Sequence, residues 1–363
     1  MSQAAAPVRV AIVGLDHWYS AFAFARAVSA CEETVLVAIA DNDLQRARYI
    51  ADHYGAERAT TDRESVAADP GVDLVASFVS SDQNPDVCAT MARAGKHLVS
   101  VKPAACTLEE AAILGAVVAE SGVLFVPSET RVRLSPQHQQ IKRWVDEGAF
   151  GRVLSVTYHL SGSLPEQWPG DPDPGWWADA ARVPGGGWID HAIYGIDLFR
   201  WLFDDEVVSA SGVAGNLKYP DLSVDDFGAA VLRFGSGIVA NIEVTWTAPA
   251  GGGRHALGMV GTEASLAFDT LTGNLSLGGN LSVTGRWEHR TPQQWDDEAI
   301  GNLVAAVRGE ASPVGTFDDA WHNLATCLAF YEAAASGVAR APVVSPTSIH
   351  GFETTGANAS GTA

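Results

Sequence analysis

Two positions in the first 41 residues have types and spacing that could bind a phosphorylated, hydroxyl-bearing molecule. The apolar run VRVAIVG ends at Gly14 and leads into a helical pattern, and a second run, VLVAIAD, ends at Asp41. The amides and dipole of a helix N-terminus favour an anion, and a carboxylate after the second strand can accept hydrogen bonds from ribose hydroxyls. Since that carboxylate would repel a 2′-phosphate, the pattern favours NAD over NADP. The alternative for Asp41 is an ordinary strand-end or N-cap aspartate.

The loop after Gly14 departs from the glycine pattern GxGxxG. It reads GLDHWY, so that Asp16 and Tyr19 stand where glycines are expected. Asp16 places a carboxylate where the backbone usually approaches a phosphate. His17 and Trp18 could contact cofactor or substrate, and exposed loop residues are the alternative. We expect Gly14, Asp16, His17, Trp18 and Asp41 to form the cofactor site.

A second group of polar residues follows three glycines at 185–187. Asp190 and Tyr194 are spaced i, i+4 on a helical pattern, so both project from one face, and the glycines allow close approach of substrate and backbone. A helix-dipole charge and core packing are the respective alternatives. His191 is turned about 100° from Asp190, which favours packing or a supporting role, with a place in the substrate pocket as the other possibility. With no second histidine or cysteine at ligand spacing, no metal is expected.

The elements that must position these residues divide the chain in two. Residues 1–127 alternate buried, β-branched runs with helical patterns, which predicts a doubly wound parallel sheet of the Rossmann type. A further helical pattern covers about 129–148. From Arg152 the strands are longer and more alternating, which predicts a mostly antiparallel open sheet in an α/β domain over 128–344.

Three helices are expected within that second domain. They run from about Trp188 to Phe203, Asp297 to Arg308 and Phe317 to Ser336, and the last is placed to pack back on the first domain. Residues 345–363 are small and polar, which predicts a disordered tail.

The stretches AGKHLVSVKPAACTLEEA and WWADAARVPGGGWIDHAIYGIDLFRWL, with VRLSPQHQQIKRWVDEGAFGRV between them, resemble the glucose-fructose oxidoreductase, inositol dehydrogenase and rhizopine-catabolism (Gfo/Idh/MocA) family. The resemblance extends to about Val344. It implies a catalytic set of Lys102, Asp190 and Tyr194, with Lys102 also near the cofactor. The chain departs from the family pattern at Val101, where glutamate is usual, and at Tyr194, where histidine is usual and some sugar dehydrogenases have tyrosine.

The implied chemistry is oxidation of a carbinol or the reverse reduction. It needs an acid/base for the hydroxyl proton while hydride moves to or from a nicotinamide. Tyrosine has a reference pKa of about 10, and it can act as this acid/base if an ammonium such as that of Lys102 favours the phenolate. A surface lysine is the alternative. The resemblance implies an NAD(P)-dependent oxidoreductase of a sugar, inositol or glycoside; an NAD-recycling glycosidase or lyase and a cofactor-poor binding protein remain open.

The loop from Pro165 to Pro184 is rich in proline, glycine and tryptophan and leads into the three glycines. Aromatic faces suit the C–H faces of sugars, so Trp168, Trp176 and Trp177 are candidates to line a pocket, with Arg182 available for hydroxyls or a carboxylate. Tryptophans packed as local core are an equal alternative. We select Trp177, Arg182 and His191 as substrate-binding residues.

Composition limits the partners. The chain has 363 residues and a formal net charge of −20, which argues against nucleic acid or an anionic membrane surface. The N-terminus lacks a signal-peptide pattern and no run is long enough to span a membrane, so a cytoplasmic location is expected. The four cysteines lie far apart, as expected of reduced thiols. An open antiparallel sheet face usually needs covering, so we expect a homodimer or homotetramer.

Overall fold

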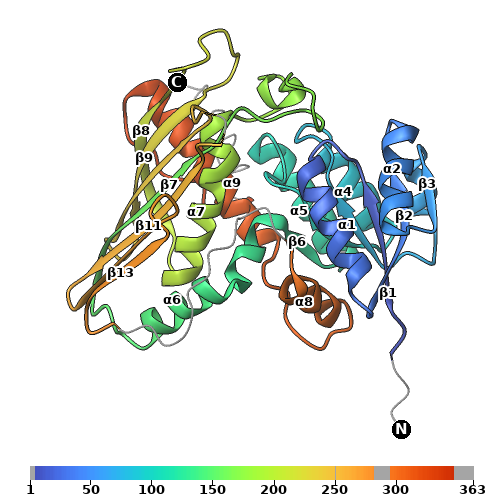
Figure 1. The fold of residues 1–363 in the computed structure, drawn as a ribbon, viewed down its shortest axis with the longest axis horizontal. Helices are drawn as coiled ribbons and strands as arrows, with labels where there is room; N and C mark the ends of the chain where they lie inside the picture. Colours follow the sequence, from blue (N-terminus) through green and yellow to red (C-terminus); the bar gives the residue numbers. More distant parts are fainter. Residues whose placement is uncertain (1–4, 250, 282–294, 347–363) are drawn as a thin grey trace, which may run out of the picture.

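The computed structural model describes residues 5–249, 251–281 and 295–346, and it contains two sheets (Figure 1). The first sheet has six parallel strands in the order β3-β2-β1-β4-β5-β6. They are β1 (Val8–Val13), β2 (Thr34–Ala40), β3 (Arg58–Thr60), β4 (Leu74–Ser77), β5 (His97–Ser100) and β6 (Phe125–Pro127). The parallel doubly wound sheet predicted from the sequence is confirmed.

The helices between these strands begin where side chains can satisfy their free backbone amides. They are α1 (Trp18–Ala30), α2 (Leu44–Tyr54), α3 (Arg63–Ala67), α4 (Asn84–Arg93) and α5 (Leu108–Ser121). Asp43 caps α2 by accepting from the amides of Gln45 and Arg46, so the alternative that Asp41 is the N-cap is wrong. Thr107 and Glu110 form a reciprocal capping box at α5.

The second sheet has seven strands in the order β13-β12-β11-β7-β10-β9-β8, antiparallel except for the pair β7–β10. They are β7 (Val153–Ser161), β8 (Val207–Gly215), β9 (Phe227–Phe234), β10 (Val239–Thr245), β11 (Arg254–Gly261), β12 (Ala264–Asp269) and β13 (Asn274–Gly279). Alternate side chains of these strands are buried, as the expected mostly antiparallel sheet requires.

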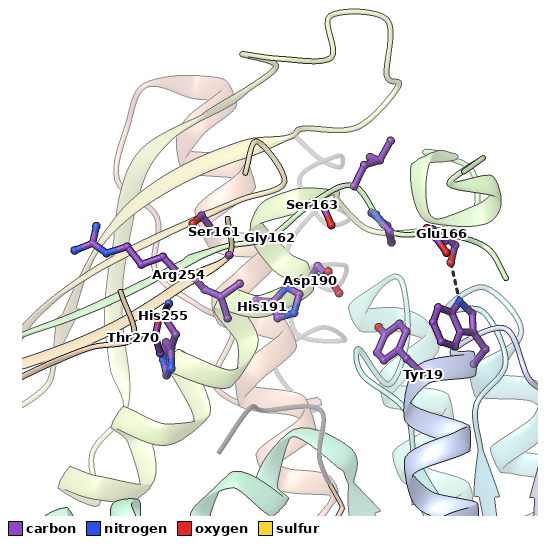
Figure 2. A pocket seen from close by; sticks show the side chains of 15 residues that line it. Tyr19, Ser161, Gly162, Ser163, Glu166, Asp190, His191, Arg254, His255 and Thr270 are labelled. Carbon is purple, nitrogen blue, oxygen red and sulfur yellow. Dashed lines mark hydrogen bonds and ion pairs between the residues drawn. The ribbon is translucent and has the colours of Figure 1, made fainter. Parts of the chain in front are cut away.

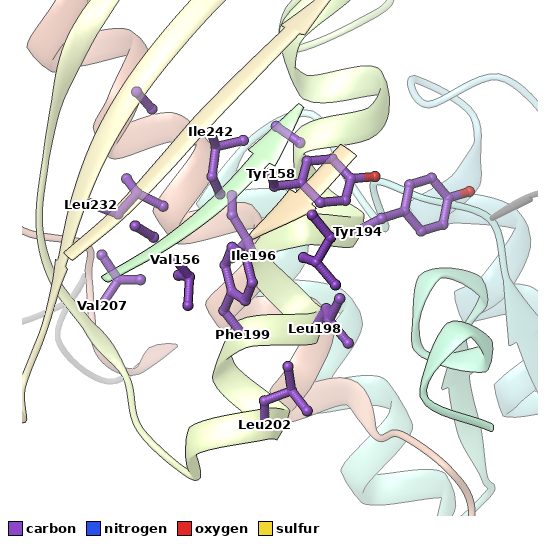
Figure 3. Close-up of a cluster of buried hydrophobic side chains, with 14 of the residues drawn as sticks. Val156, Tyr158, Tyr194, Ile196, Leu198, Phe199, Leu202, Val207, Leu232 and Ile242 are labelled. Atoms are coloured by element: carbon purple, nitrogen blue, oxygen red, sulfur yellow. The ribbon is translucent and has the colours of Figure 1, made fainter. Parts of the chain in front are cut away.

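Two long helices cover one face of this sheet, α7 (Gly187–Phe203) and α9 (Phe317–Ser336). Figure 3 shows the core between α7 and the strands, where Leu232 and Ile242 meet Phe199 and Ile196. All four side chains are buried completely or almost so. The core fixes the rotation of α7 and therefore which of its residues face the first sheet.

The segment that joins the two sheets differs from the single helical pattern expected at 129–148. It forms a 3-10 helix, η1 (Ser128–Leu134), and then α6 (Pro136–Asp146). The break lies at Ser135, whose hydroxyl accepts from the amide of His138, and Pro136 occupies the first position of α6.

The C-terminal helices return to the first sheet. Ile300 and Leu303 of α8 (Asp297–Val307) share a core with Val10 and Phe24, and α9 contacts α5 and β6. The expected return of the last helix is therefore observed. The proposed boundary at 127/128 stays a prediction, and the expected disordered tail lies outside the described residues beyond 346. No helix in the described ranges is long and apolar enough to cross a membrane.

Candidate active site

A single aspartate, Asp225, holds the N-terminus of α7. It lies in the loop before β9. The Asp225 carboxylate accepts from the amide of Gly186 at 2.8 Å and from that of Trp188 at 2.9 Å, and its carbonyl accepts from the Gly187 amide at 2.6 Å. A Cβ on Gly186 would lie 2.1 Å from the Asp225 carbonyl oxygen, so this close approach requires glycine. The contacts hold the first turn of α7, which carries Asp190.

Asp190 and Lys102 form a buried ion pair that connects the two sheets. Lys102 follows β5, and its ammonium donates to the Asp190 carbonyl at 2.6 Å and to Asp190 Oδ1. The side chains are only 3% and 6% exposed. The surface-lysine alternative is therefore wrong, and the Lys102–Pro103 peptide next to the pair is cis.

Two further groups contact the same carboxylate. Trp246 Nε1 donates to Asp190 Oδ2 at 3.1 Å, and His191 Nδ1 lies 3.0 Å from that oxygen. Burial alone would raise the pKa of Asp190, but the charges of His191 and Lys102 and their hydrogen bonds hold it well below the usual range. Asp190 is therefore an ionised carboxylate surrounded by donors.

Tyr194 lies one turn later on α7, between two cations. Its ring centroid is 5.7 Å from Lys102 Nζ and 5.5 Å from the guanidinium carbon of Arg131 in η1. Figure 3 shows it beside Tyr158 at the edge of the core. Tyr194 is only 4% exposed, so the core-packing alternative describes part of its environment.

A cavity of about 720 Å³ opens between α1 and the second sheet (Figure 2). Asp190 and His191 line it from α7, and Trp18 and Tyr19 line it from the start of α1. The remaining lining residues come from the end of β7, the loop after it, the start of β11 and the turn after β12, and they include Ser161, Ser163, Glu166, Arg254, His255 and Thr270. Neither Lys102 nor Tyr194 is among the described residues that line this cavity.

An aromatic group packs behind the cavity. The rings of Trp176 and Trp177 are stacked 4.2 Å apart, and His17 contacts them at 4.8 and 4.4 Å. Trp177 also stacks on Tyr19 at 5.7 Å and lies 5.6 Å from Lys102 Nζ. His17 is 1% exposed, so it is no exposed loop residue. Burial, together with the Lys102 charge, holds the pKa of His17 well below its usual value.

Trp168 and Arg182 lie apart from the catalytic candidates. Trp168 packs on Phe22 of α1 and under the Arg46 guanidinium, 4.4 Å away. Arg182 donates to Asp82 at 3.1 Å and to Ser80 at 2.7 Å, so it fastens the tryptophan-rich loop to the first sheet.

The residues at the carboxyl edge of the first sheet fit a dinucleotide. The N-terminus of α1 has no side-chain cap and no acidic residue in its first turn. The Asp16 carboxylate accepts from the Ser80 amide at 2.8 Å, and burial raises its pKa. Asp41 accepts from the amides of Leu15 and Asp43, and its two oxygens retain capacity for ribose hydroxyls. Among the described residues there is no cluster of three metal-ligating side chains.

Sequence reasoning missed three residues of this site: Arg131, Trp246 and Asp225. Arg131 lies in η1 near the buried polar residues Thr130 and Arg133, and nothing in the local sequence marks it as buried. Trp246 and Asp225 are brought to α7 only by the second sheet.

Known proteins match both parts of the chain. The model of the oxidoreductase family with an NAD-binding Rossmann fold (GFO_IDH_MocA) matches residues 8–128, and that of the GFO/IDH/MocA C-terminal domain matches residues 138–267. A 1,5-anhydro-D-fructose reductase of Ensifer adhaerens is 25% identical over 84% of this chain and 90% of its own length. A scyllo-inositol 2-dehydrogenase (NAD(+)) of Bacillus subtilis is 27% identical over 89% of this chain and 92% of its own.

A solved levoglucosan dehydrogenase in complex with NADH and levoglucosan has the same fold. It superposes with a TM-score of 0.79 at 22% identity and covers 93% of this chain and all of that one (100%).

Proposed function

Since the chain belongs to the Gfo/Idh/MocA oxidoreductase family, with an NAD-binding Rossmann fold, we propose that it transfers hydride between NAD and a secondary hydroxyl or ketone of a sugar, inositol or glycoside. The observation that carries the proposal is the buried Lys102–Asp190 ion pair, which joins the first sheet to a cavity wall. Relatives named for scyllo-inositol and 1,5-anhydro-D-fructose support the substrate class.

The ion pair would orient the reacting hydroxyl. Lys102 uses two of its three N–H groups on Asp190, so its ammonium holds in place the carboxylate that lines the cavity. Asp190 keeps the ammonium in place, and Trp246 keeps the carboxylate in place. The bound nicotinamide would take up or supply the hydride. With a hydroxyl bound against Asp190, these charged groups would stabilise the charge that develops on its oxygen without moving.

The cavity supports a small polyhydroxylated substrate. Ser161, Ser163 and Glu166 supply hydroxyl and carboxylate groups, whereas Tyr19 and Trp18 supply aromatic faces for C–H groups. Trp177 and Arg182 contribute from behind this wall, by packing on Tyr19 and by fixing the loop.

We further propose that NAD is preferred over NADP. Asp41 stands at the end of β2 with a carboxylate that would face the adenosine ribose. A 2′-phosphate would meet this carboxylate and the nearby Asp16.

Turnover on a defined panel tests the proposal. The purified chain is assayed for NADH formation with NAD+ and scyllo-inositol, myo-inositol or levoglucosan, and for NADH consumption with 1,5-anhydro-D-fructose. We expect turnover of at least one compound that depends on the dinucleotide. Bond cleavage without a change in NADH, or no turnover together with no dinucleotide binding, would contradict the proposal.

A further inference from the structure

We propose that His191 is the catalytic residue that exchanges a proton with the substrate hydroxyl, a role that the resemblance implies for Tyr194. This inference rests on the proposed function, because it concerns the proton that must leave the hydroxyl when hydride leaves the adjacent carbon.

His191 contacts Asp190. Nδ1 of His191 lies 3.0 Å from Asp190 Oδ2, and because an ionised carboxylate can only accept a hydrogen bond, this contact favours a proton on Nδ1. That assignment makes Nε2 the basic atom of the neutral ring. Asp190 therefore fixes both the orientation and the tautomer of the imidazole, as a carboxylate does for the histidine of a nucleophile–base pair.

His191 has access to the cavity. His191 and Asp190 line the 720 Å³ cavity, and Figure 2 shows His191 beside Asp190, facing the space between the second sheet and Tyr19. The His191 side chain is 13% exposed, against 3% for Lys102 and 4% for Tyr194. A proton acceptor must come within hydrogen-bond reach of the hydroxyl, and His191 is the titratable base on the cavity wall that Asp190 supports.

The charges around the His191 ring also favour proton transfer. The ionised Asp190 stabilises an imidazolium, while Lys102 is held on the other oxygen of the same carboxylate. The other titratable groups that face this region are Tyr19 of α1, Glu166 of the loop after β7, Arg254 and His255 of β11, and Tyr194 of α7. Arg254 is paired with Asp269 at 2.6 Å, which reduces its repulsion of a protonated His191.

In oxidation, the O–H proton of the substrate would pass to His191 Nε2, and the hydride that leaves the adjacent carbon with both electrons of the C–H bond would be accepted by a nicotinamide held at the carboxyl edge of the first sheet. The carbon–oxygen bond becomes a carbonyl, and the imidazolium returns its proton to water in the cavity. Reduction reverses each transfer, with the imidazolium as the acid.

The test compares histidine and tyrosine variants on the panel compound that the wild type turns over fastest. In His191→Asn an amide replaces Nδ1–H but no basic nitrogen remains. Tyr194→Phe removes only the phenol. His159→Asn is the matched control, because His159 also contacts a carboxylate, Glu243 at 3.1 Å, but does not line the cavity.

We expect His191→Asn to lower kcat by about 10² or more with KM changed less than about threefold, and to abolish the acid limb of the kcat/KM pH profile. His159→Asn should stay within a few-fold of wild type, and Tyr194→Phe should retain the acid limb. Added imidazole should raise the turnover of His191→Ala and leave His159→Ala unchanged. Near-wild-type kcat in His191→Asn, or loss of the acid limb in Tyr194→Phe instead, would overturn the inference.

Dinucleotide binding separates this inference from the proposed function. NADH fluorescence titration should give the same affinity for wild type and His191→Asn, since His191 supports the substrate side. An active wild type with an unaffected His191→Asn variant contradicts only the role of His191, whereas a wild type that binds no dinucleotide contradicts the proposed function.

Discussion

Lys102 and Asp190 illustrate what a buried charge pair implies at the scale of single residues. Two charges removed from water are costly unless each is paired and hydrogen-bonded, and here the carboxylate receives Lys102, Trp246 and His191. Removing either Lys102 or Asp190 leaves the charge of the other residue buried without its partner. The pair is better explained by a role in positioning than by stability alone, because a hydrophobic replacement would stabilise the fold equally well.

Lys102→Met should therefore lose both activity and stability. We expect kcat to fall by about 10² or more, and the free energy of unfolding to fall by about 3–5 kcal/mol because Asp190 loses its cationic partner. Turnover and denaturant unfolding measure the two effects. Lys142→Met is the control, since Lys142 pairs with Asp146 on α6, where an i,i+4 pair contributes only about 0.3–0.5 kcal/mol. Equal kcat in wild type and Lys102→Met would remove Lys102 from the reaction.

The catalytic candidates could be identified from the sequence because Lys102, Asp190 and Tyr194 stand in local motifs. The contacts that these residues make could not be predicted from the sequence. Nothing in the sequence indicates that the Lys102 ammonium pairs with Asp190, which lies 88 positions away. Nor could it show that Trp246 donates to the same carboxylate or that His17 is buried, because both depend on how the second sheet and the tryptophan-rich loop pack.

Among the helices and strands, the start of α7 passes close to the backbone of the loop before β9, at Asp225. A Cβ on Gly186 would meet the Asp225 carbonyl oxygen at 2.1 Å, whereas a Cβ on Gly301 in α8 would meet nothing within 4 Å. Gly186→Ala should displace the first turn of α7, and with it Asp190 and His191.

We expect Gly186→Ala to lower kcat by about 10-fold or more and to destabilise the fold by about 1–3 kcal/mol. Gly301→Ala should stabilise it by about 0.5–1 kcal/mol without changing kcat, since alanine favours a helix interior. Unfolding midpoints and turnover measure both. A Gly186→Ala protein as stable and active as wild type would show that the loop tolerates a Cβ.

A second group of elements meets at Glu129 in η1, where α7 and α9 pack together. Glu129 accepts from Asn323 at 3.2 Å, and Asn323 also donates to Asp197, which pairs with Arg133. Burial, followed by the charge of Asp197, raises the pKa of Glu129 from the ordinary 4.5 to about 7. The folded protein thus binds a proton that the unfolded chain releases.

The sign of the resulting pH dependence is fixed by linkage. Between the unfolded value of 4.5 and the folded value of about 7, the folded state binds more protons, so stability contributed by Glu129 is lost as pH rises through this range. Glu129→Gln should match wild type near pH 5 and exceed it by on the order of 2 kcal/mol at pH 8. Denaturant unfolding at both pH values measures this. Identical pH profiles would show that Glu129 titrates normally.

Most elements could be predicted from periodicity, because long buried strands and amphipathic helices have clear patterns. The break between η1 and α6 was missed because the helical pattern continues on both sides of it, although Ser135 followed by Pro136 is a signal for a helix start. The three-residue β3 and the glycine-rich β13 were missed because short strands are determined by pairing with their neighbours.

For the whole molecule, one face of the second sheet is packed on α7 and α9, while the other exposes valines. Val213, Val231 and Val260 are 61%, 45% and 48% exposed, and Val231 and Val260 each follow a buried residue of their strand. In Figure 1 both helices lie on the same side of this sheet. We propose that a second copy of the chain covers the exposed face, giving a homodimer or homotetramer.

The double variant Val231→Glu/Val260→Glu tests this assembly. Light scattering should show wild type as a dimer or tetramer and the variant as a smaller species, because opposed carboxylates resist burial. Exposed Leu271→Glu on the turn after β12 is the control and should not change the mass. A monomeric wild type would contradict the assembly.

Dinucleotide binding tests the central claim most directly, because the oxidoreductase assignment depends on it despite Asp16 and Tyr19 in the loop. Calorimetry of the purified chain with NAD+ and NADP+ side by side, with mass spectrometry of any ligand that co-purifies, gives the answer. We predict that NAD+ binds, and that NADP+ binds at least about 10-fold more weakly because of Asp41. Failure of both to bind would contradict the account.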